Sequence, residues 1–201
     1  MFAVVGLAVA SVGWRLRGVS RSLPGAVLGI GLGGATAGTL AAIDGYPWSN
    51  VLVLAVGVAA GVLLGGALPA RARPMLRLLV VLSVLDGAQL LFAGGTGGDP
   101  SESWFHLLVR GSQGNLLKLG VVDLVLVVAM AVHGARRGLS FWPATLAGPV
   151  GLLVAFAYAA LVRPAGGLVL VPFLLVGWVL VELWVSDVRR RRSWREPSDV
   201  A

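Results

Sequence analysis

The chain of 201 residues contains no cysteine and only two histidines, His106 and His133. The absence of cysteine excludes disulfide bonds, thiolate metal sites and cysteine nucleophiles. The two histidines do not form an HExxH pattern, which argues against a zinc hydrolase. We therefore expect neither a metal site nor a cofactor.

Charged residues are also scarce, at 12% of the sequence, whereas a soluble domain usually contains about 25%. Hydrophobic residues make up 57%, and the mean hydropathy is +0.89. The apolar residues form long runs rather than periodic stripes, as in helices that face lipid. The composition predicts an all-α, polytopic transmembrane helix bundle.

Reading for apolar runs of about 17–25 residues predicts about seven spans. Their approximate bounds are Phe2 to Trp14, Leu23 to Ile43, Val51 to Leu68, Leu76 to Ala93, Leu116 to Val132, Phe141 to Val162, and Leu168 to Val185. In the long loop between the fourth and fifth spans, the segment SWFHLLV is predicted to form a short interfacial helix. We divide the chain into an N-terminal three-span region (1–74), a four-span core (75–187) and a basic tail (188–201).

The arginines predict the orientation of these spans. They occur after the first span, between the third and fourth, between the fifth and sixth, and after the seventh, whereas the alternate loops are poor in basic residues. By the positive-inside rule the N-terminus is outside and the C-terminus is cytoplasmic, as in a multi-pass protein of the cell membrane. We interpret the net charge of +7 as a topology signal rather than as a nucleic-acid site, and we expect the basic tail to lie near anionic headgroups.

Glycine is abundant, with 29 residues. The segment GIGLGGATAG, residues 29–38, has the glycine density of a dinucleotide fingerprint but lies inside an apolar span rather than between a strand and a helix. Glycines at four-residue spacing, such as Gly57, Gly61 and Gly65, instead favour close packing of helices.

Ionisable side chains inside a bilayer are costly and commonly functional. Asp44 is expected at a helix end, Glu182 is expected to snorkel or to pair with the arginine tail, and Asp187 is expected at the interface. Asp86 and Asp123 are each predicted to lie roughly 13–15 Å from the cytoplasmic ends of the fourth and fifth spans. Because these spans are consecutive and antiparallel, the two carboxylates could face each other.

Two carboxylates in a low dielectric share one proton and titrate as a pair, the arrangement used for acid–base hydrolysis of peptides. Ser83 and Gln89 flank Asp86 on one helix face and could bind it or a water molecule. Gly120, three residues before Asp123, would let a substrate backbone approach. The sequence also allows each aspartate simply to cap a helix or bond to a neighbouring one.

In its last four spans, the chain resembles the presenilin and signal peptide peptidase family of intramembrane aspartyl proteases, as a divergent member with degenerate motifs. That family has one aspartate after a tyrosine, a second in Gly-x-Gly-Asp, and a Pro-Ala-Leu motif on the last span. Here VLD ends at Asp86, with Leu85 in place of tyrosine, and KLGVVD ends at Asp123, with Val122 in place of the second glycine. The segment PAGGLVLVPFLLVGW carries the Val-Pro pair found in signal peptide peptidases, and the predicted orientation of the spans agrees with theirs.

The resemblance implies a catalytic dyad of Asp86 and Asp123, with Gly167, Leu168 and Pro172 shaping a site for the substrate strand. It implies that the substrates are transmembrane peptides, such as signal peptide remnants in type II orientation. Two alternatives remain open from the residues alone. One is a small proton-coupled transporter that relays protons through Asp86, Asp123 and Glu182. The other is a non-catalytic membrane scaffold whose polar residues hold helices together.

Overall fold

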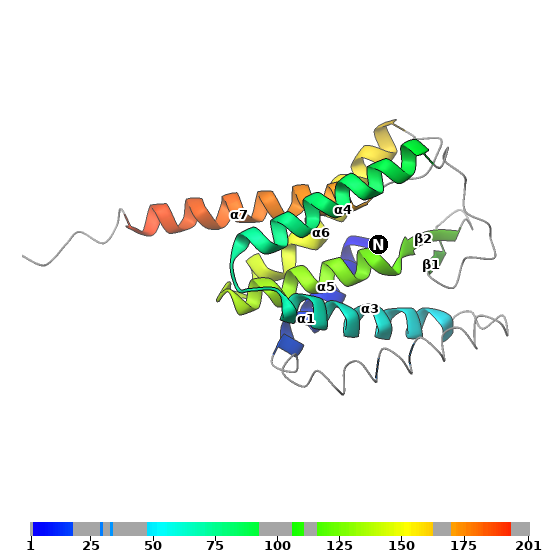
Figure 1. Cartoon of the computed structure of the whole chain (residues 1–201), viewed down its shortest axis with the longest axis horizontal. Helices are drawn as coiled ribbons and strands as arrows, with labels where there is room; N and C mark the ends of the chain where they lie inside the picture. The colour runs from blue at the N-terminus through cyan, green and yellow to red at the C-terminus, as the bar shows by residue number, and fades with distance from the viewer. Residues whose placement is uncertain are drawn as a thin grey trace, which may run out of the picture.

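The computed structural model describes residues 2–17, 29, 33, 48–92, 106–110, 116–162 and 170–193. These residues form helices and one hairpin of two strands (Figure 1). The helices are α1 (Phe2–Arg15), α3 (Trp48–Ala67), α4 (Ala72–Phe92), α5 (Val121–Arg136), α6 (Phe141–Val162) and α7 (Val171–Ser193). The strands are β1 (His106–Arg110) and β2 (Leu116–Gly120).

The helical fold class is confirmed, and six of the predicted spans coincide broadly with a helix. The remaining span, residues 23–43, lies almost entirely outside the described residues. Two described helical segments, Phe141–Ala159 and Val171–Arg191, have the length and apolar composition needed to cross a membrane. Core helices of soluble proteins can meet the same two criteria, so the count of seven spans and the orientation of the termini stay predictions.

The hairpin corrects two predictions. The segment SWFHLLV was expected to include a short helix, but its residues from His106 onward form strand β1. The fifth span was expected to begin at Leu116, but Leu116–Gly120 form β2, which pairs antiparallel with β1 from His106 opposite Gly120 to Arg110 opposite Leu116. Gly120 has an extended backbone (φ −63°, ψ 143°), so α5 begins only at Val121. With 16 residues, α5 is about 24 Å long, which is shorter than a typical hydrocarbon core.

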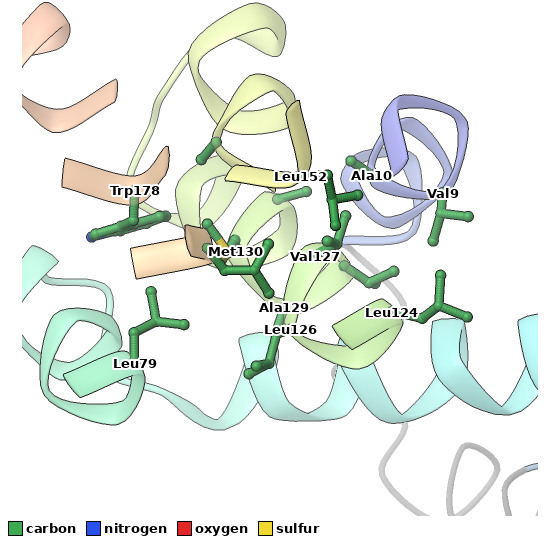
Figure 2. Packing of buried hydrophobic residues seen from close by; sticks show 14 of the residues in the cluster. Val9, Ala10, Leu79, Leu124, Leu126, Val127, Ala129, Met130, Leu152 and Trp178 are labelled. Atoms are coloured by element: carbon green, nitrogen blue, oxygen red, sulfur yellow. The ribbon is translucent and has the colours of Figure 1, made fainter. Parts of the chain in front are cut away.

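Helix α5 lies at the centre of the fold, packed against α1, α3 and α6. Nearly all of its side chains from Leu124 to His133 are buried. Figure 2 shows Met130 and Val127 in the middle of the core, with Trp178 of α7 on one side and Leu152 of α6 on the other. Residues of the predicted N-terminal region, among them Val9 and Val62, belong to the same hydrophobic core as those of the predicted four-span core.

Three glycines of α3 let that helix approach α5 closely. A Cβ added at Gly61 would lie 2.5 Å from the Cβ of Val128, and one added at Gly65 would lie 2.5 Å from the carbonyl oxygen of Ala129. At Gly57 the nearest atom would be Leu124 Cβ, at 3.1 Å. The packing role predicted for these glycines therefore agrees with the structure.

Polar side chains at the end of α5 hold the neighbouring segments. Nε2 of the buried His133 lies 2.7 Å from the carbonyl oxygen of Arg71, to which it donates a hydrogen bond. Arg136 donates to the carbonyl oxygens of Gly66 and Leu68 at the end of α3. These bonds fix the α3–α4 connection against α5, so that α4 can run from this point across α7 (Figure 1).

Candidate functional site

Asp86 lies on α4 and its carboxylate contacts the start of α7. Its Oδ2 accepts a hydrogen bond from the backbone N–H of Val171, at 3.3 Å. Val171 is the first residue of α7, and the first N–H groups of a helix have no acceptor within that helix. The half-buried Asp86 thus satisfies a backbone donor from another segment and places a carboxylate at the positive end of a helix.

Asp123 is in the first turn of α5, and its carboxylate accepts a hydrogen bond from the backbone N–H of Gly120. Gly120 is the N-cap residue, so this bond matches the backward half of a capping box. A Cβ on Gly120 would lie 2.8 Å from Asp123 Oδ2. The missing side chain at Gly120 therefore leaves room for the carboxylate of Asp123 itself, which differs from the substrate-facing role predicted for this glycine.

The carboxylates of Asp86 and Asp123 lie close enough to repel each other electrostatically. They come from different helices, and α4 packs chiefly on α7 whereas α5 packs chiefly on α3. The fourth and fifth spans, which as consecutive antiparallel helices could have been direct neighbours, therefore pack chiefly on other helices. The two carboxylates approach each other although their helices make little direct contact.

The two aspartates lie at similar distances from the arginine-containing ends of their helices. Asp86 is separated from the start of α4 at Ala72, and Asp123 from the end of α5 at Arg136, by about 20 Å in each case at the helical rise. These distances are longer than the predicted 13–15 Å because they are counted from the helix ends, and α4 and α5 continue beyond the apolar runs into arginine-containing turns. The depth of either aspartate in a membrane therefore stays a prediction.

The residues predicted to support Asp86 lie differently. The Ser83 hydroxyl donates to the Leu79 carbonyl oxygen of its own helix, at 2.7 Å, so its proton is not directed at Asp86. The backbone of Gln89 belongs to α4, but its side chain lies outside the described residues. Next to Asp123, the side chain of Val122 is 55% exposed, so the valine that replaces a glycine of the family motif is not packed into the core.

The Val-Pro pair of the last motif lies at the start of α7. Pro172 is the second residue of this helix, where the absence of a backbone N–H costs little. Its neighbour Val171 is the residue bonded to Asp86. Pro172 therefore lies next to a residue that contacts Asp86. Gly167 and Leu168 lie outside the described residues, so their part in a substrate strand site stays a prediction.

Glu182 is held by a partner that the sequence did not reveal. Its carboxylate forms a two-point ion pair with Arg137, which follows α5, whereas the expected partner was the arginine tail. In that tail, Arg191 pairs instead with Asp187, at 2.8 Å. Glu182 lies about 16 Å along α7 from Val171, so it is remote from Asp86 and does not join the pair of aspartates.

Within the described residues, no group of three or more histidine, aspartate or glutamate side chains is arranged to hold a metal ion. The described site consists of two interacting carboxylates, one of which is bonded to the start of α7. Comparison of the chain with protein-family profiles, curated protein sequences and solved structures finds no match.

Proposed function

We propose that this chain is a multi-pass membrane protein that hydrolyses peptide bonds in transmembrane segments, with Asp86 and Asp123 as its catalytic dyad. The observation that carries the proposal is the approach of these two carboxylates from α4 and α5 to within electrostatic reach. Their similar distances from the arginine-containing ends of α4 and α5 add support, as does the bond from Asp86 to Val171, next to Pro172 of the family-like motif.

The proposed reaction follows from a pair that shares one proton. The ionised aspartate takes a proton from water while the water oxygen bonds to the substrate carbonyl carbon. The protonated aspartate gives its proton to the carbonyl oxygen. As the C–N bond breaks, the first aspartate returns its proton to the leaving nitrogen and the second recovers one from a hydroxyl of the intermediate, which restores the starting state.

The proposed setting is a bundle of about seven spans with its N-terminus outside and its C-terminus cytoplasmic. This orientation would favour type II transmembrane substrates such as signal peptide remnants. Their backbone would dock beside the segment from Gly167 and Leu168 to Pro172, close to the start of α7.

The test is cleavage of a reporter transmembrane segment by the purified chain in lipid vesicles. Asp86→Asn and Asp123→Asn are each expected to abolish cleavage while the protein still accumulates in the membrane. Asp187→Asn is the matched control, because Asp187 is an acid of α7 paired with the exposed Arg191 and is expected to be dispensable. Cleavage that survives both dyad changes would overturn the proposal, as would a folded wild-type chain that cleaves no segment of a broad reporter panel.

A non-catalytic scaffold is the second candidate, and one observation favours it. Each aspartate already accepts a backbone hydrogen bond, Asp86 from Val171 and Asp123 from Gly120. A purely structural pair would tolerate asparagine, which keeps an acceptor oxygen, without loss of any activity. The proton-coupled transporter has less support, since Glu182, its third relay group, is paired with Arg137. Uptake that depends on a proton gradient would identify it.

A further inference from the structure

A cavity of about 370 Å³ lies between two parts of the fold. One side is formed by the α5–α6 turn and the start of α6, and the other by the C-terminal part of α7. Its volume falls within the usual range for small-molecule sites. It is lined by Gly138, Leu139, Ser140, Trp142, Pro143, Trp184, Val185, Val188 and Arg189. Gly138 makes the turn that forms one side, with φ at +78°, a value that favours glycine.

The lining combines an apolar wall with a single cation. Trp142 and Trp184 are 57% and 46% exposed, although both are large aromatic side chains. Among the described residues that line the cavity, Arg189 is the only charged one, and none is a carboxylate. Among the described residues Arg189 has no ion-pair partner, in contrast to Arg191, two residues further along α7, which pairs with Asp187. The cavity therefore complements a ligand that is apolar over most of its length and anionic at one end.

The place of the cavity in the fold points to the same ligand. It lies at the arginine-rich end of the fold, near Arg136, Arg137 and the end of α7, where that helix extends beyond the other helices (Figure 1). In the proposed topology this is the cytoplasmic interface. Tryptophan side chains favour the headgroup level of a bilayer, and the cytoplasmic leaflet is the anionic one.

We propose that this cavity binds one anionic phospholipid, with its acyl chain against Trp142 and Trp184 and its phosphate at Arg189. The inference rests on the membrane setting of the proposed function but not on proteolysis. An isolated soluble anion would leave the tryptophan wall uncovered, and a zwitterionic lipid would bring an ammonium group close to Arg189.

The test uses the full chain in phosphatidylcholine vesicles. In one titration the vesicles contain increasing fractions of phosphatidylglycerol with brominated acyl chains, and in the other increasing fractions of phosphatidylcholine with brominated acyl chains. Bromine quenches the fluorescence of nearby tryptophan residues. The quenching that is lost in the double variant Trp142→Phe, Trp184→Phe is the quenching that arises in the cavity. Brominated phosphatidylglycerol is expected to half-saturate this quenching at a fraction about fivefold lower than brominated phosphatidylcholine, the factor that one arginine near an anionic surface provides.

Arg189→Gln is expected to remove most of this preference. Arg77→Gln is the matched control, because Arg77 is an exposed arginine of α4 outside the cavity, and it should retain the preference. Equal half-saturation by the two lipids in the wild-type chain would overturn the inference, as would equal losses in the two arginine variants. Absence of cavity quenching by either lipid would also overturn it, because the cavity would then be covered by protein, such as a second copy or residues 194–201. Asp86→Asn should keep the lipid preference, which separates this inference from the proposed protease.

Discussion

Arg137 and Glu182 form a two-point ion pair that joins the end of α5 to α7. Nη2 of Arg137 lies 3.0 Å from Oε2 of Glu182, and Nη1 contacts Oε1. The two side chains are 10% and 25% exposed, and the guanidinium also lies over the ring of Trp178, at 5.6 Å from its centroid. Among the described residues, this ion pair links the end of the central helix to the last one.

Loss of one partner of this ion pair is expected to destabilise the fold. Glu182→Gln leaves a largely buried guanidinium without its counter-charge, which should lower the free energy of unfolding by about 2 kcal/mol. Thermal unfolding in detergent measures the change. Asp187→Asn, which breaks an exposed pair between residues four apart on α7, should cost no more than about 0.5 kcal/mol. Equal losses of stability in the two variants would contradict the larger contribution expected from the Arg137–Glu182 pair.

Two glycine-to-alanine substitutions, one in α3 and one in α4, are expected to change stability in opposite directions. Gly61→Ala would place a methyl group 2.5 Å from Val128 Cβ and 2.7 Å from the Val125 carbonyl oxygen, so it should destabilise by about 1–3 kcal/mol. Gly87→Ala, where a Cβ meets nothing within 4 Å, should stabilise α4 by up to about 1 kcal/mol through helix propensity. The melting temperatures of the two variants should therefore move in opposite directions, and a common direction would refute the close approach of α3 to α5.

Two substitutions at Asp86 distinguish its structural role, the hydrogen bond from the Val171 N–H, from its proposed role in proton transfer. Asp86→Asn keeps an acceptor for the Val171 N–H and should leave thermal stability nearly unchanged while it abolishes cleavage. Asp86→Ala removes the acceptor and should cost about 1 kcal/mol, as for the loss of a helix cap. If the asparagine variant is as unstable as the alanine variant, the effect of Asp86 on activity cannot be assigned to proton transfer.

His133 is expected to matter for stability through one hydrogen bond. It is fully buried and its Nε2 bonds to the Arg71 carbonyl oxygen. His133→Leu fills a similar volume but leaves that oxygen without its donor, so unfolding should become easier by about 1–2 kcal/mol. Hydrogen exchange at the start of α4 should rise as well, because the bond holds the α3–α4 connection. Unchanged exchange there would show that the bond does not restrain α4.

The absence of cysteine makes the predicted topology directly measurable. Single cysteines at Ser101 and Ser140 lie on opposite sides of the membrane in the seven-span arrangement. A membrane-impermeant maleimide should label Ser101→Cys in intact cells and Ser140→Cys only after permeabilisation. Labelling of both in intact cells would contradict the orientation of the termini.

Several features of this fold are determined by the sequence alone. The long apolar runs predict helices, since backbone groups in an apolar setting must be satisfied within their own segment. The four-residue glycine spacing predicts the close approach of α3 and α5, because it depends only on the helical repeat. The similar distances of Asp86 and Asp123 from the arginine-containing ends of α4 and α5 depend on the same regular rise, so they too could be predicted.

Other features were decided only by the tertiary structure. The sequence contains a local signal for the hairpin, since two apolar runs flank GSQGN, a segment rich in residues that favour turns. Runs this short are also compatible with helix, and it is the pairing of β1 with β2 that makes them strands. Which helix lies beside α4, and which arginine holds Glu182, depend on packing between segments distant in the chain. The same holds for the bond from Asp86 to Val171. Sequence periodicity can set the height of a side chain on its helix, but only packing sets what that side chain faces.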